Sequence, residues 1–150
     1  MAEVLVPVEL LTGVAEMDDQ HSDLFREMHK VKNALLAVSG DDGEGRMLLL
    51  QLIDDLEEHF AWEEAAARAH TIPCDEHQRE HARILAFVRA KMAEFDRGSC
   101  NIPALMVFME RKFESHVSHF DMSLGRALRD AAAAHDAGFP AARQQRADAA

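Results

Sequence analysis

Five histidines and two carboxylates fall at spacings that could hold two metal ions inside a helical bundle. Two pairs, His59 with Glu63 and His77 with His81, are each four residues apart, so each pair shares one face of an α-helix. Each pair also continues an apolar stripe, which directs it towards a protein core. A buried imidazole needs a polar partner and a buried carboxylate needs one more, and metal coordination satisfies both. The full set of candidate ligands is His21, His59, Glu63, His77, His81, His116 and Asp121.

The mixture of imidazole and carboxylate indicates which metals could bind. It suits iron, zinc, copper or nickel better than magnesium or calcium, which prefer oxygen ligands. Cys74 and Cys100 stand alone without a Cys-x-x-Cys spacing, so we expect neither a cysteine-rich zinc site nor a disulfide framework. Seven ligands are too many for one ion and suit two. No glutamate stands three residues before a histidine, so the ferritin-like carboxylate design is not expected.

Four stretches with helical periodicity must position these side chains. We predict helices from about residue 18 to Ser39-Gly40, over 44–69, over 75–96 and over 103–134, with Pro103 in the first turn of the last one. Helices of this length joined by short connections predict an all-α, antiparallel, up-down-up-down four-helix bundle. We expect an extended N-terminal arm over 1–16, the bundle over 17–134 and a flexible tail over 135–150, because Gly138-Phe139-Pro140 should end helical order.

Length and charge exclude several classes of protein. The chain has 150 residues, which suits one domain with a sizeable core. Its net charge of −11 argues against binding to nucleic acid or to an anionic membrane, since both need clustered lysine and arginine. The early apolar run Val4–Leu11 is broken by Pro7 and Glu9, so it predicts neither a signal peptide nor a membrane span. The isolated cysteines indicate a reducing, cytoplasmic setting.

Four short segments, one in each predicted helix, carry the candidate ligands. They are Met17-Asp18-Asp19-Gln20-His21 (preceded by Thr12-Gly13-Val14), His59-Phe60-Ala61-Trp62-Glu63-Glu64, His77-Gln78-Arg79-Glu80-His81, and His116 through Asp121. In this order they resemble the motifs of the hemerythrin family, and of bacterial hemerythrins in particular. The resemblance covers roughly residues 10–125. Each motif is weak alone, but all four in order are highly specific.

The resemblance implies a non-haem di-iron centre, bridged by a solvent-derived oxygen, that binds O₂ reversibly. By that analogy Glu63 and Asp121 bridge two irons, and the histidines divide unequally between them: His77, His81 and His116 on one iron, His21 and His59 on the other. Two six-coordinate irons held in this way leave one position open. That position lies on the iron with fewer histidines, and O₂ would bind there.

Three functions remain open on the residues. The leading interpretation is a protein that carries, stores or senses O₂, and a lone domain of this size favours a carrier or store. The rival is a di-iron enzyme that consumes peroxide or reduces nitric oxide. A third interpretation is an iron-storage protein, or a bundle that metal merely stabilises. No serine or cysteine has a motif-placed histidine partner, which lowers the enzyme interpretation without excluding it.

Asp121 is the least regular of the candidate ligands. It follows His116 by five residues, which places it well around an α-helix from that histidine. His119 is the local competitor, but it is only two residues from Asp121 and so lies nearly opposite to it on the helix. We therefore favour His116 as the ligand.

The chain also departs from the family after the paired glutamates. Relatives often place a methionine or another large apolar residue there, whereas this chain has Ala65-Ala66-Ala67. We expect a roomier pocket beside the open iron position. Small anions such as azide should then reach the ferric form easily.

Overall fold

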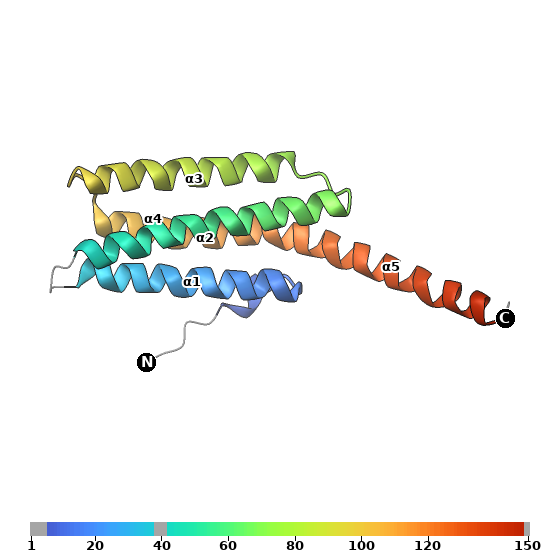
Figure 1. The fold of residues 1–150 in the computed structure, drawn as a ribbon. Coiled ribbons are helices and arrows are strands. Elements are labelled where there is room, and N and C mark those ends of the chain that lie inside the picture. The colour runs from blue at the N-terminus through green and yellow to red at the C-terminus, as the bar shows by residue number, and fades with distance from the viewer. Residues whose placement is uncertain (1–5, 38–41, 149–150) are drawn as a thin grey trace.

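The fold is a bundle of four antiparallel helical segments (Figure 1). The computed structural model describes residues 6–37 and 42–148, with side chains described for 6–37 and 43–136. Its elements are η1 (Val8–Leu10), α1 (Ala15–Leu36), α2 (Asp42–Ala69), α3 (Asp75–Asp96), α4 (Ile102–His116), η2 (Val117–Asp121) and α5 (Met122–Asp148). Within those ranges there is no strand, and α4, η2 and α5 follow one another as the fourth segment. The predicted all-α four-helix bundle is confirmed.

The core has a large part and a small part. The large part is rich in leucine and methionine and includes Leu56, Phe60 and Phe113. The small part, here called the end cluster, comprises Met17, Ala67, Leu124 and Leu128. Met17, Ala67 and Leu124 each lie three or four residues from a predicted ligand on the same helical segment. The end cluster therefore packs one helical turn beyond the ligands.

The described part of the N-terminal arm, from residue 6 onward, is not fully extended. Val8–Leu10 forms a 3₁₀ turn, and α1 begins at Ala15, before the predicted start near residue 18. The Asp18 carboxylate accepts hydrogen bonds from the backbone N–H of Thr12 at 2.8 Å and from its hydroxyl at 2.7 Å. Thr12 in turn packs closely against Gly125. A Cβ added to Gly125 would lie only 2.7 Å from the Cβ of Thr12. Asp18 therefore fastens the arm to the bundle.

The turns around the third and fourth segments follow the expected residue chemistry. Gly98, with φ of 72°, takes the left-handed conformation just after α3, where residues with a Cβ are strained. Asn101 caps α4 by accepting a hydrogen bond from the Ala104 N–H at 3.1 Å, and Pro103 lies in the first turn as predicted. The predicted helix end at Ser39-Gly40 lies outside the described residues.

The fourth segment continues further than the sequence indicated. We predicted its end near residue 134, but α5 runs to Asp148, and Gly138-Phe139-Pro140 does not interrupt it. The surrounding stretch is rich in alanine, which has the highest helix propensity. Figure 1 shows α5 extending past the ends of the other helices. The division of the chain into an arm, a bundle and a flexible tail stays a prediction.

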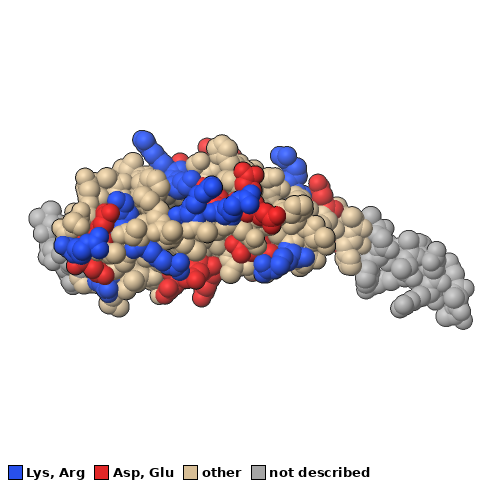
Figure 2. Space-filling model, turned by 90° about the horizontal axis from the view of Figure 1, so that it is seen from above, with Lys and Arg blue, Asp and Glu red and all other residues tan. Residues whose placement is uncertain are grey.

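Charged side chains of both signs are interspersed over the face of the molecule in Figure 2. Ion pairs on the described surface include Arg46 with Asp96 and Arg89 with Glu57. Within the described ranges, no helix combines the length and the apolar character that crossing a membrane requires.

Candidate metal centre

The seven predicted ligands meet inside the bundle. His21 comes from α1, His59 and Glu63 from α2, His77 and His81 from α3, His116 from the end of α4, and Asp121 from η2. All seven are buried, and the most exposed of them, His77, retains 7% of its accessible surface. They form two groups that share Glu63 and Asp121, and within each group the candidate ligand atoms lie within 4.8 Å of one another.

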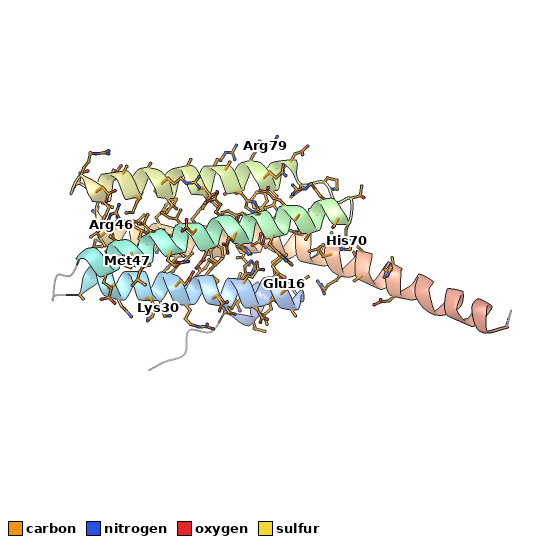
Figure 3. All side chains as sticks on the ribbon, viewed as in Figure 1. Glu16, Lys30, Arg46, Met47, His70 and Arg79 are labelled. Atoms are coloured by element: carbon orange, nitrogen blue, oxygen red, sulfur yellow. The ribbon has the colours of Figure 1, made fainter. Side chains whose placement is uncertain are left out.

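The remaining histidines lie elsewhere. His29, His70, His119 and His135 are all exposed. Figure 3 places His70 at the end of α2. This position lies outside the bundle interior, and it is in the interior that side chains from all four segments meet. It also shows Arg79, between His77 and His81 in the sequence, pointing away from the bundle. The helical period thus turns His77 and His81 inward and Arg79 outward.

Glu63 divides its two oxygens between two sets of histidines. Its Oε1 lies 2.9 Å from His59 Nε2 and 3.6 Å from His21 Nε2. Its Oε2 lies 3.1 Å from His81 Nε2 and 3.2 Å from His77 Nε2. One carboxylate therefore faces two groups of imidazole nitrogens, which is the arrangement that a bridging ligand needs.

Asp121 repeats this division from the opposite helix. Its Oδ2 lies 2.9 Å from His21 Nε2, whereas its Oδ1 lies 2.9 Å from His77 Nε2 and 3.1 Å from His116 Nε2. The centre thus has two parts joined by two carboxylates. We call them the three-histidine half (His77, His81 and His116) and the two-histidine half (His21 and His59).

The cluster contains buried polar atoms whose partners in the protein satisfy them poorly. The Nε2 atoms of His21 and His59, together with Glu63 Oε1 and Asp121 Oδ2, make no hydrogen bond of good geometry, although His59 Nε2 lies 2.9 Å from Glu63 Oε1 and His21 Nε2 lies 2.9 Å from Asp121 Oδ2. All four belong to the two-histidine half or face it. Buried polar atoms in folded proteins are normally paired, because leaving one unpaired costs about 1–3 kcal/mol. A cation among these four atoms would satisfy them all, and imidazole with carboxylate is a suitable donor set for iron.

The electrostatics of the cluster also call for positive charge. Burial disfavours the charged form of His21 and His77, but the carboxylates of Asp121 and Glu63 outweigh it and raise the pKa of each histidine to about 9. Burial likewise favours the neutral form of Glu63 and Asp121, yet hydrogen bonds from the surrounding histidines hold the pKa of each carboxyl below its ordinary value. Protons therefore occupy positions that bound cations would take.

A π-helical turn explains the position of Asp121. Residues Val117–Asp121 form η2, and the Met122 N–H donates to the Val117 carbonyl, five residues earlier. Residues five apart then lie near one face, so Asp121 returns to the side of His116. The prediction that Asp121 lies well around the helix from His116 was wrong for this reason. His119 stays on the surface and donates its Nδ1–H to the Ser115 carbonyl at 2.8 Å.

Comparison with families of known proteins decides the family. Residues 12–138 match the model of the hemerythrin HHE cation binding domain. The chain belongs to the hemerythrin family. The match takes in all four helical segments of this hemerythrin domain and extends past the resemblance seen over residues 10–125. Neither the curated proteins nor the solved structures compared with the chain match it.

Two hydrogen-bond partners of the histidines were not predicted. The hemerythrin domain holds His59 through its Nδ1–H, which donates to Gln20 Oε1 at 2.8 Å, and His81 through its Nδ1–H, which donates to Glu64 Oε1 at 2.9 Å. In the sequence, Gln20 and Glu64 are distinguished only as neighbours of candidate ligands. The sequence could have predicted that Glu64 faces a neighbouring helix, because the residue after Glu63 lies about 100° further around α2.

Aromatic rings fix the outer faces of the imidazoles. Phe60 stacks on His81 with ring centroids 4.0 Å apart and an angle of 10° between the planes. Phe113 meets His21 edge to face at 5.6 Å. Contacts of this kind restrict ring rotation and keep water away from the ring faces.

The alanine run lies partly in the end cluster, and the roomier pocket beside the open iron position stays a prediction. Ala65 is exposed and Ala66 half-buried, while Ala67 is fully buried in the end cluster with Met17 and Leu124. Met17, also fully buried, supplies apolar bulk from α1. A large residue after the paired glutamates is therefore not needed to fill this part of the described core.

Proposed function

We propose that this hemerythrin domain holds two iron ions and binds O₂ reversibly, as a carrier, store or sensor. The observation that carries the proposal is the division of Glu63 and Asp121 between two groups of histidines. A single-ion site has no use for two carboxylates that each face two ligand groups. The family match to a cation-binding domain supports the same conclusion.

The residues assign a place to each ion. The three-histidine half would hold one iron and the two-histidine half the other, with Glu63 and Asp121 shared. Because the two-histidine half supplies one imidazole fewer, it leaves a coordination position for an external ligand. Bound iron supplies the electrons that reversible binding of O₂ requires.

The protein itself contributes geometry and exclusion of water. Phe113 contacts the His21 ring and also lies against Phe25, with ring centroids 5.0 Å apart. On the opposite side, the buried Met17 lies four residues before His21, one turn along the same face of α1. These apolar groups cover the His21 side of the two-histidine half and limit access of water and protons from that side.

A cycle of O₂ exposure and evacuation tests the proposal. The ferrous protein, prepared without air, is exposed to O₂ and then to vacuum while its visible spectrum is followed. We expect an absorption band that appears with O₂ and disappears under vacuum over several cycles. His59→Ala should lose the band, whereas His119→Ala, which removes an exposed histidine, should keep it. A spectrum that bleaches once, with turnover of added peroxide, would instead indicate an enzyme.

A further inference from the structure

Two of the clustered histidines are held from outside by different chemistry. His81 donates its Nδ1–H to the carboxylate of Glu64 at 2.9 Å. His59 donates its Nδ1–H to the amide oxygen of Gln20 at 2.8 Å. Both imidazoles are buried, at 2% and 3% exposure, so each ring has few other partners available.

In a neutral imidazole, each of these hydrogen bonds favours the tautomer with the proton on Nδ1. Nε2 is then free to offer its lone pair to a cation, which would replace the proton that His81 Nε2 shares with Glu63 in the metal-free protein. In both rings Nε2 points to Glu63, at 3.1 Å for His81 and 2.9 Å for His59. Glu64 and Gln20 therefore orient a lone pair towards the position of a cation in each half of the centre.

The two partners differ in charge. Glu64 places a carboxylate behind an imidazole of the three-histidine half, and its side chain is 25% exposed, so part of its charge acts through the protein interior. Gln20 places a neutral amide behind an imidazole of the two-histidine half. A carboxylate behind a ligating imidazole makes it a stronger donor than an amide does. The three-histidine half therefore has both more imidazole ligands and a stronger imidazole donor than the two-histidine half.

We propose that Glu64 is a positioning residue that makes the two halves of the centre unequal. Through His81 it strengthens cation binding in the three-histidine half and lowers the reduction potential of iron there. Gln20 orients His59 without adding charge. This inference rests on the proposed metal centre. It predicts that the first cation to bind occupies the three-histidine half and that the two-histidine half fills second.

Titration of the metal-free, full-length chain with cobalt(II) tests the inference. Wild type should bind two cations with unequal affinities, followed by calorimetry and by the visible cobalt spectrum. Glu64→Gln keeps the acceptor and removes the charge, while Glu64→Ala removes both. We expect the tighter affinity to fall by about 10–100-fold, less in Glu64→Gln than in Glu64→Ala, with the weaker affinity unchanged. Gln20→Glu should instead tighten the weaker site.

The control variant separates the hydrogen bond from charge alone. Glu76→Gln removes the same charge from an exposed residue beside His77, in the same half of the centre, and should leave both affinities unchanged. A second readout uses ⁵⁷Fe: the Mössbauer signal of one iron only should change in Glu64→Gln. This readout does not depend on O₂ binding, and Glu64→Gln and Gln20→Glu keep the test valid if Glu64→Ala fails to fold.

The outcomes distinguish this inference from the proposed function. Two cations bound with the same affinities in wild type, Glu64→Gln and Glu64→Ala would overturn the role of Glu64 and leave the metal centre intact. An equal loss in Glu76→Gln and Glu64→Gln would also overturn it, because charge alone would then suffice. Failure of wild type to bind any cation would defeat the metal centre and this inference with it.

Discussion

The two halves of the metal centre share Glu63 and Asp121 but differ in how their inward nitrogens are satisfied. In the three-histidine half, these nitrogens make hydrogen bonds within the cluster. In the two-histidine half, the Nε2 atoms of His21 and His59 lie equally near carboxylate oxygens yet make no hydrogen bond of good geometry. The inward nitrogens are therefore better paired in the first half than in the second, where a bound cation would satisfy the remaining atoms. The difference indicates where an external ligand would bind.

The largest expected effect comes from removing what the halves share. Glu63→Ala takes away a carboxylate that faces four histidines, so both halves should lose their cation. Each polar group left unsatisfied in the core costs about 1–3 kcal/mol. Iron should then no longer raise the melting temperature, because it cannot bind the folded state. Thermal melts with and without iron test this, and a variant that melts like wild type in both conditions would contradict it.

Two variants, each lacking one histidine from a different half, should affect iron binding differently. His59→Ala leaves the three-histidine half intact, so the iron content should fall to about one ion per chain. His77→Ala removes a ring that contacts both carboxylates, and should lower both the iron content and the stability of the metal-free protein. Elemental analysis and thermal melts measure the two effects. Equal iron contents in the two variants would mean that the halves are not distinct.

The stability of the metal-free protein should fall at alkaline pH. The pKa of His21 and of His77 is raised from 6.5 to about 9, so their contribution is fully present below pH 6.5 and is lost as the pH rises through 9. Since one pKa unit corresponds to about 1.4 kcal/mol, the loss should be on the order of a few kcal/mol. Lowered pKa values of Glu63 and Asp121 act in the opposite direction: their contribution is present at neutral pH and disappears in acid.

Bound iron should remove the alkaline loss, because the cations replace the protons. Melting temperatures of the metal-free and iron-loaded protein at pH 6.5 and above pH 9 provide the measurement. A metal-free protein whose melting temperature does not fall between these pH values would show that the carboxylates do not hold protons on these histidines.

The smallest effect on the metal centre should come from substitutions in and beside the end cluster. Ala67→Leu adds bulk beside the buried Met17 and Leu124, and overpacking of this kind costs about 1–3 kcal/mol. Ala66→Leu, at a half-buried position, should cost less. Because Ala67 already packs tightly, neither change should slow azide binding to the ferric form. Slower azide binding in Ala67→Leu would support the roomier pocket that the sequence predicts beside the open iron position.

Most of the centre could be predicted because its residues obey the helical period. The four-residue steps from His59 to Glu63 and from His77 to His81 point each pair to one face, and apolar neighbours identify that face as buried. Asp121 could be named from its motif but not placed. A π-helical turn depends on what the packed helices demand and has no strong local propensity.

Contacts between helices were beyond the reach of local patterns. Gln20 holds a histidine of α2 from α1, and Glu64 holds a histidine of α3 from α2. Such pairs appear only when the helices are rotated into place. The continuation of α5 through Pro140 was missed because proline was given more weight than the alanine-rich stretch around it.

The central claim is that two irons share Glu63 and Asp121 as bridges. The most direct measurement combines the iron content of the purified protein with electron paramagnetic resonance of its ferric form. The account predicts two irons per chain and, because bridged ferric ions couple magnetically, no signal from isolated ferric iron. One iron per chain, or two irons that give the strong signal of isolated high-spin ferric ions, would contradict it.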